Sequence, residues 1–242
     1  MPTYQEAANI NELLTQLRGV TDADVLVVDD ASPDGTADIA ASCDAALGGV
    51  FVLRRHGKTG LGDAYLAGFA WALERPYEVV VGMDADLSHD PALVPTLIGL
   101  TDEAAVVIGS RYIAGGSTPD WPLRRRLLSV WANRYASKML RLSINDVTSG
   151  FRAYRADLLR TLDLQRIRAE GYAFLVEMAD VAVQSGASVR ETPICFRDRE
   201  HGKSKMSLRV VAESMFLVTR WGIQRRLRGA ARRPQSVDAA TK

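Results

Sequence analysis

EVVVGMDAD, residues Glu78–Asp86, decides the fold, because an apolar run ends there in two carboxylates two positions apart. Its first seven residues, Glu78–Asp84, predict a short buried strand. A second run of the same kind, DVLVVDD, occupies Asp24–Asp30 and also ends in a pair of carboxylates. The sequence therefore predicts two buried strands that each end in acidic residues.

The segments around these two runs alternate between strand and helix patterns. Further strands are predicted at Val50–Arg54 and Ala104–Ser110, and helices at Glu6–Arg18, from about Thr36, and from about Leu61 to Glu74. This alternation predicts an α/β fold in which helices cover both faces of a mostly parallel sheet. Ligands bind at the carboxyl ends of the strands in such sheets. The acidic residues expected to gather there are Asp29, Asp30, Asp84 and Asp86.

The second half of the chain follows a different pattern. It contains a basic helical stretch at Pro122–Leu140, an apolar helix at Gly171–Gln184, a strand at Ser188–Phe196 and a long helix at Met206–Leu227. We find no internal repeat, and the linkers are short. We expect one Rossmann-like domain over residues 1–205, followed by an amphipathic helix and a basic tail over residues 206–242.

Composition narrows the class of protein. Of the 242 residues, 47% are hydrophobic and 24% are charged, which is typical of a globular fold. The formal net charge of +1 argues against a nucleic-acid partner. The two cysteines, Cys43 and Cys195, match neither a disulfide framework nor a metal-ligand spacing. We recognise no signal peptide and no run of roughly 18 apolar residues, so we expect no transmembrane helix.

The tripeptide Asp84-Ala85-Asp86 predicts a metal site. Alternate residues of an extended segment point the same way, so both carboxylates can face one ligand. Two carboxylates at one spot repel each other unless a cation lies between them. Mg²⁺ or Mn²⁺ prefers oxygen ligands and leaves positions open for the oxygens of a diphosphate. An isolated Asp-x-Asp is more often a surface turn, but its place after a buried strand favours the metal site.

The sequence resembles the dolichol-phosphate mannose synthases, which are inverting family 2 glycosyltransferases with a GT-A fold. The resemblance spans residues 2 to about 206, and the motifs that carry it occur in the family's order. They are Pro2-Thr3-Tyr4-x-Glu6, Val28-Asp29-Asp30-x-Ser32-Pro33-Asp34-Gly35-Thr36, Met83-Asp84-Ala85-Asp86-Leu87-Ser88-His89, Gly109-Ser110-Arg111-Tyr112, Thr148-Ser149-Gly150-Phe151-Arg152, Glu170-Gly171-Tyr172 and Arg199-x-x-Gly202-Lys203-Ser204-Lys205.

The resemblance implies a role for each matching residue on the donor side. Pro2, Tyr4 and Glu6 would line the nucleotide pocket, and Val28 and Asp30 would hold the base and ribose. Asp84, Ala85 and Asp86 would contact the diphosphate and the metal, with Ser88 as a further metal contact. Arg199 and Lys205 would cover the donor diphosphate. Asp86 and Arg111 are expected to be catalytic.

On the acceptor side, the resemblance implies that Arg111, Arg125 and Ser129 hold a phosphate. Arg125 and Ser129 lie at i and i+4, which places both on one helix face. The neighbouring Arg124 and Arg126 leave this register uncertain by one residue. No general base is needed, because a phosphate monoester with a second pKa near ~6 is already anionic at neutral pH.

The function implied by the resemblance is transfer of mannose from GDP-mannose to a polyprenyl phosphate, with Mg²⁺ or Mn²⁺. Two alternatives remain open at this point. One is a polyprenyl-phosphate glucosyltransferase that uses UDP-glucose, and the other is a non-catalytic nucleotide-sugar-binding protein. Members of the family have a hydrophobic strand just before the segment that here begins at Pro2, so we expect the sheet to lack that strand.

The helix at Met206–Leu227 has a broad apolar surface and leads into a tail rich in arginine. A narrow polar stripe of Arg209, Glu213, Arg220 and Gln224 runs along it. This pattern fits a helix that lies in the bilayer interface next to anionic lipid. It fits a helix that packs on the core equally well. We expect a peripheral protein on the cytoplasmic face of the membrane, recruited by this helix or by an integral membrane partner.

Overall fold

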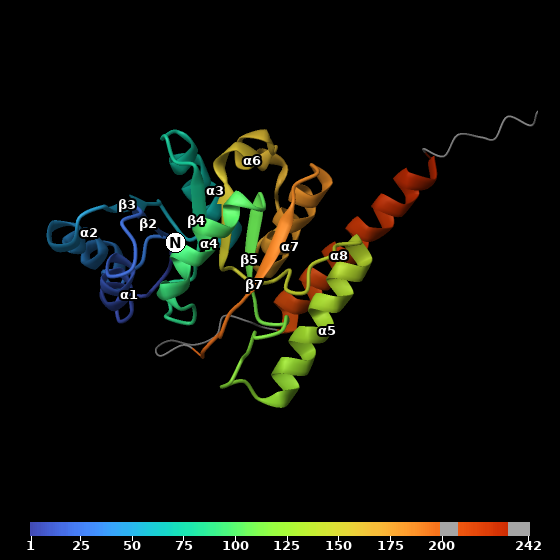
Figure 1. The fold of residues 1–242 in the computed structure, drawn as a ribbon, viewed down its shortest axis with the longest axis horizontal. Coiled ribbons are helices and arrows are strands. Elements are labelled where there is room, and N and C mark those ends of the chain that lie inside the picture. Colours follow the sequence, from blue (N-terminus) through green and yellow to red (C-terminus); the bar gives the residue numbers. More distant parts are fainter. Residues whose placement is uncertain (199–207, 232–242) are drawn as a thin grey trace, which may run out of the picture.

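The chain folds around two β-sheets that lie next to each other (Figure 1). The computed structural model describes residues 1–198 and 208–231, and within the last helix the side chains of residues 212–227. The first sheet is parallel and has the order β1 (Pro2–Thr3), β2 (Val25–Asp29), β3 (Val50–Arg54). The second has the order β4 (Val79–Gly82), β6 (Arg152–Arg155), β5 (Val106–Ser110), β7 (Val189–Pro193).

The strands predicted from apolar runs are confirmed, and they are β2, β3, β4, β5 and β7. The sequence did not reveal β6, which lies antiparallel between β4 and β5. Its sequence RAYR begins with Arg152, whose side chain is fully buried, and an arginine is ordinarily a sign of exposed surface. Because β6 runs against its neighbours, the loop that precedes it lies at the edge where β4 and β5 end.

A short strand opens the chain within the Pro2–Glu6 segment, so the expected absence of a strand before Pro2 is not contradicted. Pro2 and Thr3 pair in parallel with Val28 and Asp29 of β2. The strand is two residues long, and it is built from the Pro2–Glu6 segment itself. This pairing places the segment beside the carboxyl end of β2.

Eight helices cover the two sheets within the described residues. They are α1 (Ile10–Arg18), α2 (Thr36–Leu47), α3 (Leu61–Leu73), α4 (Val94–Gly99), α5 (Leu123–Leu140), α6 (Ala156–Thr161), α7 (Gly171–Gln184) and α8 (Leu208–Ala231), with short 3₁₀ turns at Pro91–Leu93, Leu100–Asp102 and Leu164–Arg166. Strand β5 separates two hydrophobic cores. Val106 and Ile108 face the core formed with α3, α5 and α7, whereas Val107 faces the core formed with α1 and α2. Both faces of the sheet are therefore covered, as expected.

The last helix, α8, packs against α5 and α7, and α5 and α8 lie side by side at one end of the molecule (Figure 1). Val218 is buried in the same core as α7, and Tyr135 and Thr219 share a hydrogen bond of 2.7 Å. Arg225 donates to the carbonyl of Leu140 and pairs with Asp180. One face of α8 thus belongs to the core. No helix in the part of the chain that the structure describes has both the length and the hydropathy of a membrane-spanning segment.

Candidate active site

A cavity of about 360 Å³ opens where β2, β4 and β5 end. Most of the residues expected to bind the donor or the acceptor line it: Pro2, Tyr4, Glu6, Asp30, Asp84, Ala85, Asp86, Arg111, Arg125 and Ser129. Val28 and Ser88 are buried and do not line it. Arg199 and Lys205 lie outside the described residues. The structure thus brings segments from β1 to α5 to one place.

One end of the cavity is formed by the segments after β1, β2 and β3, which carry Tyr4, Asp30 and Lys58. Asp30 forms an ion pair with Arg55, with 2.6 Å between Oδ1 and Nη1. Lys58 places its ammonium 4.0 Å from the centre of the Tyr4 ring. Val28 packs its side chain against Gly68 of α3. Arg55 and Lys58 were not predicted as site residues, and they lie just before and within a glycine-rich stretch at Gly57–Gly62.

Neighbouring side chains hold the carboxylate of Asp86 and the backbone of Asp84. Ser88 donates from its backbone N–H, at 3.1 Å, and from its hydroxyl, at 2.5 Å, to Oδ1 of Asp86. Nδ1 of His89 accepts the backbone N–H of Asp84 at 3.2 Å, and the ring stacks on Phe151. Burial lowers the pKa of His89, although the charges of Asp84 and Asp86 act in the opposite direction. Ser88 therefore orients a carboxylate of Asp86.

Backbone strain collects at the same edge. Gln5, Ala31 and Leu87 have φ of 59°, 54° and 62°, and each follows the end of β1, β2 or β4 by a few residues. A left-handed conformation is costly for residues with a β-carbon and persists only where the surrounding structure imposes it. The three turns therefore aim the segments that carry Tyr4, Asp30 and Asp86 into the cavity.

The acidic pair fits a hard divalent cation. Asp84 and Asp86 both line the cavity, and Asp86 is only 2% exposed. Among the residues that the structure describes, no group of three or more His, Cys, Asp or Glu side chains is arranged to hold a metal. Two carboxylates leave most of the coordination positions of Mg²⁺ or Mn²⁺ to a ligand such as a diphosphate. This donor set suits a metal that is shared with a substrate.

The expected acceptor residues come from β5 and α5. Arg125 and Ser129 lie on one face of α5 and line the cavity, whereas Arg124 and Arg126 are exposed and do not. Of the three consecutive arginines, Arg125 is therefore the one that lines the cavity. The guanidinium of Arg125 lies 4.0 Å from the Trp121 ring and 2.9 Å from Asp198. Ser129 accepts a hydrogen bond of 2.6 Å from the Tyr112 hydroxyl.

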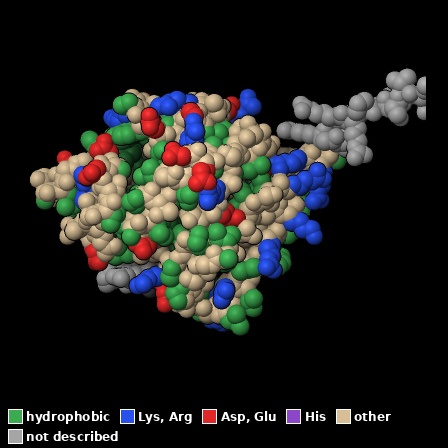
Figure 2. Space-filling model, in the orientation of Figure 1, with side chains coloured by type: hydrophobic (Ala, Val, Ile, Leu, Met, Phe, Trp, Pro, Cys, Tyr) green, Lys and Arg blue, Asp and Glu red, His purple; other side chains and the backbone are tan. Residues whose placement is uncertain are grey.

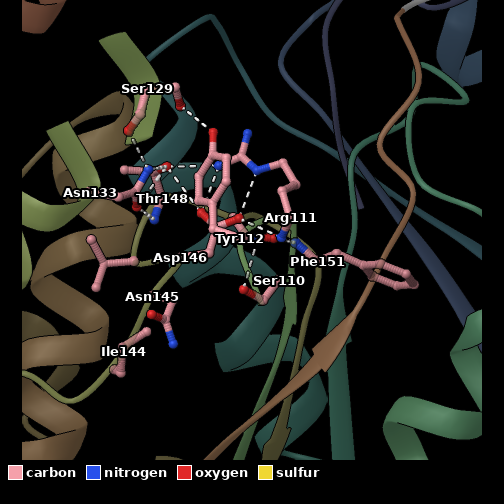
Figure 3. Close-up of polar contacts among 12 residues, drawn as sticks. Ser110, Arg111, Tyr112, Ser129, Asn133, Ile144, Asn145, Asp146, Thr148 and Phe151 are labelled. Carbon is pink, nitrogen blue, oxygen red and sulfur yellow. Dashed lines mark hydrogen bonds and ion pairs between the residues drawn. The ribbon is translucent and has the colours of Figure 1, made fainter. Parts of the chain in front are cut away.

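Arg111, directly after β5, is almost completely buried (Figure 3). Its Nε and Nη2 each donate to Asp146 at 2.7 Å, and its backbone N–H donates to the same carboxylate at 3.0 Å. Nη2 also donates to the Thr148 hydroxyl at 2.8 Å. Asp146 and Thr148 belong to the loop before β6, which the sequence reading left unassigned.

An apolar wall lines part of the cavity. Side chains from three helices form it: Leu128, Ala132 and Ala136 of α5, Leu175 and Val176 of α7, and Met215 and Val218 of α8. No single segment of the sequence shows this wall, because it exists only where the three helices pack together. One cavity therefore joins acidic, cationic and apolar surfaces.

Solved structures of low sequence identity share this fold. Glucosyl-3-phosphoglycerate synthase from Mycobacterium tuberculosis, in complex with Mn²⁺, UDP and glucosyl-3-phosphoglycerate, matches with a TM-score of 0.62 at 19% identity. The match covers 97% of this chain and 79% of that one. The same enzyme in complex with Mn²⁺, UDP-glucose and phosphoglyceric acid gives a TM-score of 0.64. This likeness supports the expected GT-A fold.

Sequence comparisons identify the family of the chain and two similar proteins. Residues 1–163 match the family model described as glycosyl transferase family 2. Undecaprenyl-phosphate mannosyltransferase of Micrococcus luteus is 47% identical over 230 residues, which is 95% of each chain. Polyprenol monophosphomannose synthase of Mycolicibacterium smegmatis is 44% identical over 232 residues, covering 94% of this chain and 87% of the relative. The resemblance seen in the motifs is confirmed, and this chain belongs to glycosyltransferase family 2.

Proposed function

We propose that this chain transfers mannose from GDP-mannose to the phosphate of a polyprenol and inverts the anomeric centre. The observation that carries the proposal is the single cavity that joins an acidic pair, two arginines and an apolar wall. These surfaces match a metal-bound diphosphate, an anionic acceptor and a lipid chain, in that order. The two relatives that are 47% and 44% identical are named for mannose transfer to such acceptors.

On the donor side, Asp84 and Asp86 would hold Mg²⁺ or Mn²⁺ against the diphosphate, with Ser88 acting through Asp86. The metal would stabilise the charge that develops on the leaving nucleotide. Tyr4, Glu6 and Asp30 line the part of the cavity where the nucleotide would lie, and Pro2 and Ala85 border it. Val28, behind Asp30, would support this pocket from the core. Arg199 and Lys205, outside the described residues, are proposed to cover the diphosphate.

On the acceptor side, Arg111, Arg125 and Ser129 would hold the polyprenyl phosphate so that one of its oxygens faces the sugar. The phosphate is anionic at neutral pH because its second pKa is about 6. Catalysis then consists of alignment and of charge stabilisation at the leaving group. A direct displacement of this kind inverts the anomeric centre.

A lipid acceptor requires the protein to contact a membrane surface, and the exposed faces of α5 and α8 would make that contact. Figure 2 shows Lys and Arg side chains gathered on the flank formed by these helices, with hydrophobic side chains beside them. Large apolar side chains are exposed on both: Leu123, Leu127, Leu128 and Trp131 on α5, and Phe216, Ile223 and Leu227 on α8. Helix α5 contains no acidic residue. An apolar stripe flanked by cations suits an anionic bilayer interface on the cytoplasmic side.

The proposed function is tested with the purified chain, a short polyprenyl phosphate, and either Mg²⁺ or Mn²⁺. Labelled GDP-mannose and UDP-glucose are compared as donors, and the Asp86→Ala variant serves as the inactive control. We expect a mannolipid product from GDP-mannose whose anomeric configuration is opposite to that of the donor. Preferential use of UDP-glucose, or a product of retained configuration, would contradict the proposal.

A further inference from the structure

We propose that Asp146 is a positioning residue which, together with Thr148, fixes the guanidinium of Arg111 so that Nη1 alone is presented to the acceptor phosphate. This inference rests on the proposed function, because it describes how the acceptor site of that reaction is built. It assigns roles to two residues of the loop before β6 that the sequence left without one.

The hydrogen bonds around Arg111 leave one nitrogen for a ligand. Nε and Nη2 are taken by the two oxygens of Asp146, and Nη2 also bonds Thr148 (Figure 3). Within the described residues, Nη1 forms no hydrogen bond. Arg111 lines the cavity, so Nη1 is the nitrogen that can meet an acceptor there. The two-nitrogen fork, which an arginine commonly offers to a phosphate, is turned toward Asp146 instead.

Aromatic rings restrict the guanidinium further. Its central carbon lies 5.1 Å from the centre of the Tyr112 ring and 5.4 Å from the centres of the Trp121 and Phe196 rings. These contacts fall within the range of a cation–π interaction. With the rings around it and Asp146 on one edge, the guanidinium has little room to rotate.

The Arg111–Asp146 pair is too well buried to open when the acceptor binds. The side chains are 6% and 0% exposed. Burial acts to raise the pKa of Asp146, but the charge and hydrogen bonds of Arg111 outweigh it, and the pKa is lowered. The carboxylate is therefore ionised in the folded protein. Separating the two charges would leave an uncompensated charge in the interior, which is strongly unfavourable.

The second arginine of the site is paired very differently. Arg125 and Asp198 are 33% and 46% exposed at their side chains. Exposed pairs of this kind contribute little, so an anionic acceptor can displace Asp198. Arg125 would thus attract the phosphate by its charge, whereas Arg111 would orient the phosphate through one fixed nitrogen, Nη1.

The backbone of Asp146 and the hydroxyl of Thr148 are themselves held in place. The backbone N–H of Asp146 donates to Glu191 of β7 at 2.9 Å. Asn133 of α5 donates to the Thr148 hydroxyl at 3.1 Å and accepts the Thr148 backbone N–H at 3.2 Å. The loop is therefore tied to a strand on one side and to a helix on the other. Such support is what a positioning residue needs in order to fix another side chain.

The test is a double-mutant cycle between Thr148 and Arg111. Thr148→Val keeps the shape of the side chain and removes the hydroxyl, whereas Thr148→Ser keeps the hydroxyl. Arg111→Lys keeps the buried charge next to Asp146 but has no Nη2. Calorimetry measures the affinity of a short polyprenyl phosphate for the four proteins of the cycle, and separately the affinity for GDP-mannose. Thermal unfolding verifies that each variant is folded.

We expect Thr148→Val to weaken acceptor binding about 10-fold, since a hydrogen bond to a charged group is lost. We expect the acceptor affinity of Thr148→Ser to lie within about 2-fold of that of the wild type. The affinity for GDP-mannose should be unchanged in both Thr148 variants. In the Arg111→Lys protein, Thr148→Val should have little further effect, because Thr148 acts through Nη2. An equal loss in both backgrounds would overturn the positioning role, as would no loss in either.

The cycle is read from binding, so its outcome is separate from that of the proposed reaction. If the wild-type protein forms mannolipid but the effects of the two substitutions are additive, only the positioning role of Asp146 and Thr148 is refuted. A wild-type protein that forms no mannolipid refutes the proposed function, while a coupled cycle would still support a positioned Arg111. Asp146→Asn provides a second variant, and we expect it to weaken acceptor binding at least as much as Thr148→Val.

Discussion

Gly150 lies directly against Asp84, so that a β-carbon at residue 150 would be 3.2 Å from Oδ1 of that carboxylate. The same β-carbon would be 3.3 Å from the hydroxyl of Tyr65, which is buried. The loop before β6 therefore restricts where one of the two proposed metal ligands can be. A β-carbon at residue 150 would require the carboxylate of Asp84 or the hydroxyl of Tyr65 to shift by a few tenths of an ångström.

Gly150→Ala is expected to displace Asp84 and to weaken metal binding, because the added methyl must push the carboxylate or Tyr65 aside. Overpacking of this kind costs about 1–3 kcal/mol. The measurement is the metal concentration that gives half-maximal turnover, which should rise about 10-fold, as for a disturbed ligand environment. Gly99→Ala is the matched control, since nothing lies within 4 Å of a β-carbon there. An unchanged metal requirement in Gly150→Ala would argue against Asp84 as a ligand.

Removal of the metal is expected to abolish turnover, and Asp86→Ala should lower it at least about 100-fold even at high metal concentration. Ser88→Ala removes only the hydrogen bond that orients Asp86, so a loss of about 10-fold is expected. Turnover is measured after treatment with EDTA and again after Mn²⁺ or Mg²⁺ is restored. Full activity in EDTA would rule out the assigned roles of Asp84 and Asp86.

The exposed pair of Arg125 and Asp198 should respond to substitution in opposite directions. Arg125→Ala is expected to raise the KM for polyprenyl phosphate about 10-fold, because a charged contact is lost. Asp198→Asn removes the competing carboxylate and should lower that KM by up to about 5-fold. Both are measured in detergent, together with the affinity for GDP-mannose, which should not change. Arg124→Ala is the control, because Arg124 does not line the cavity.

Binding to anionic liposomes should weaken in high salt without disappearing. Each arginine near the bilayer contributes about 1 kcal/mol, which salt screens, whereas the apolar stripe is insensitive to salt. Replacing Trp131 and Phe216, two of the exposed apolar side chains, with serine should weaken the salt-resistant part. Phe51→Ser is the control, since Phe51 is 42% exposed on β3. If the protein did not co-sediment with the liposomes at low salt, α5 and α8 would not form a membrane-binding surface.

Truncation before α8 does not test membrane binding. Val218 is 2% exposed and belongs to the main core, so loss of the helix would open that core. We expect truncated protein to be strongly destabilised, as thermal unfolding would show. Substitutions on the outward face of α8 are the appropriate probe, because they leave the packed face intact.

The buried pair predicts how stability depends on pH. The pKa of Asp146 is lowered by Arg111 in the folded protein, so the pair stabilises the fold above the ordinary carboxyl pKa of about 3.9. This contribution is lost as the pH falls through the lowered pKa. At pH 7, Asp146→Asn should cost about 3–5 kcal/mol in urea unfolding.

The cost of Asp146→Asn should shrink as the pH is taken well below about 4, since protonation then removes the same charge. Asp198→Asn is the comparison, because an exposed pair contributes about 0–1 kcal/mol. A cost of Asp146→Asn that stayed constant with pH would contradict a stabilising charge on Asp146.

Local sequence was enough to predict the framework of the site. The strands at 25–29, 79–82 and 106–110 are apolar runs, and burial on both faces of a sheet requires such runs. Asp30, Asp84 and Asp86 follow two of those strands, and the carboxyl ends of strands are where ligands bind in α/β folds. The i, i+4 spacing of Arg125 and Ser129 was also visible, because spacing is a property of the helix alone, but the sequence did not show which of the three neighbouring arginines lines the cavity.

The partners of these residues could not be read from the sequence. Arg152 is buried with its guanidinium bonded to the carbonyls of Val147, Ser149 and Leu175, and nothing local distinguishes it from a surface arginine. Strand β6 was missed for that reason. Asp146 meets Arg111 across 35 positions of sequence, and it does so only because β6 runs antiparallel beside β5.

By itself, the sequence determined the family and the candidate residues of the site, which are the two carboxylates after a strand and the arginines. Only the tertiary structure decided how those residues are held. It turned the fork of Arg111 toward Asp146, packed one face of α8 on the core and left the other exposed. The physical reason is that residue types and spacing record local preferences. The direction of a buried charge depends on hydrogen bonds between segments that meet only in the folded chain.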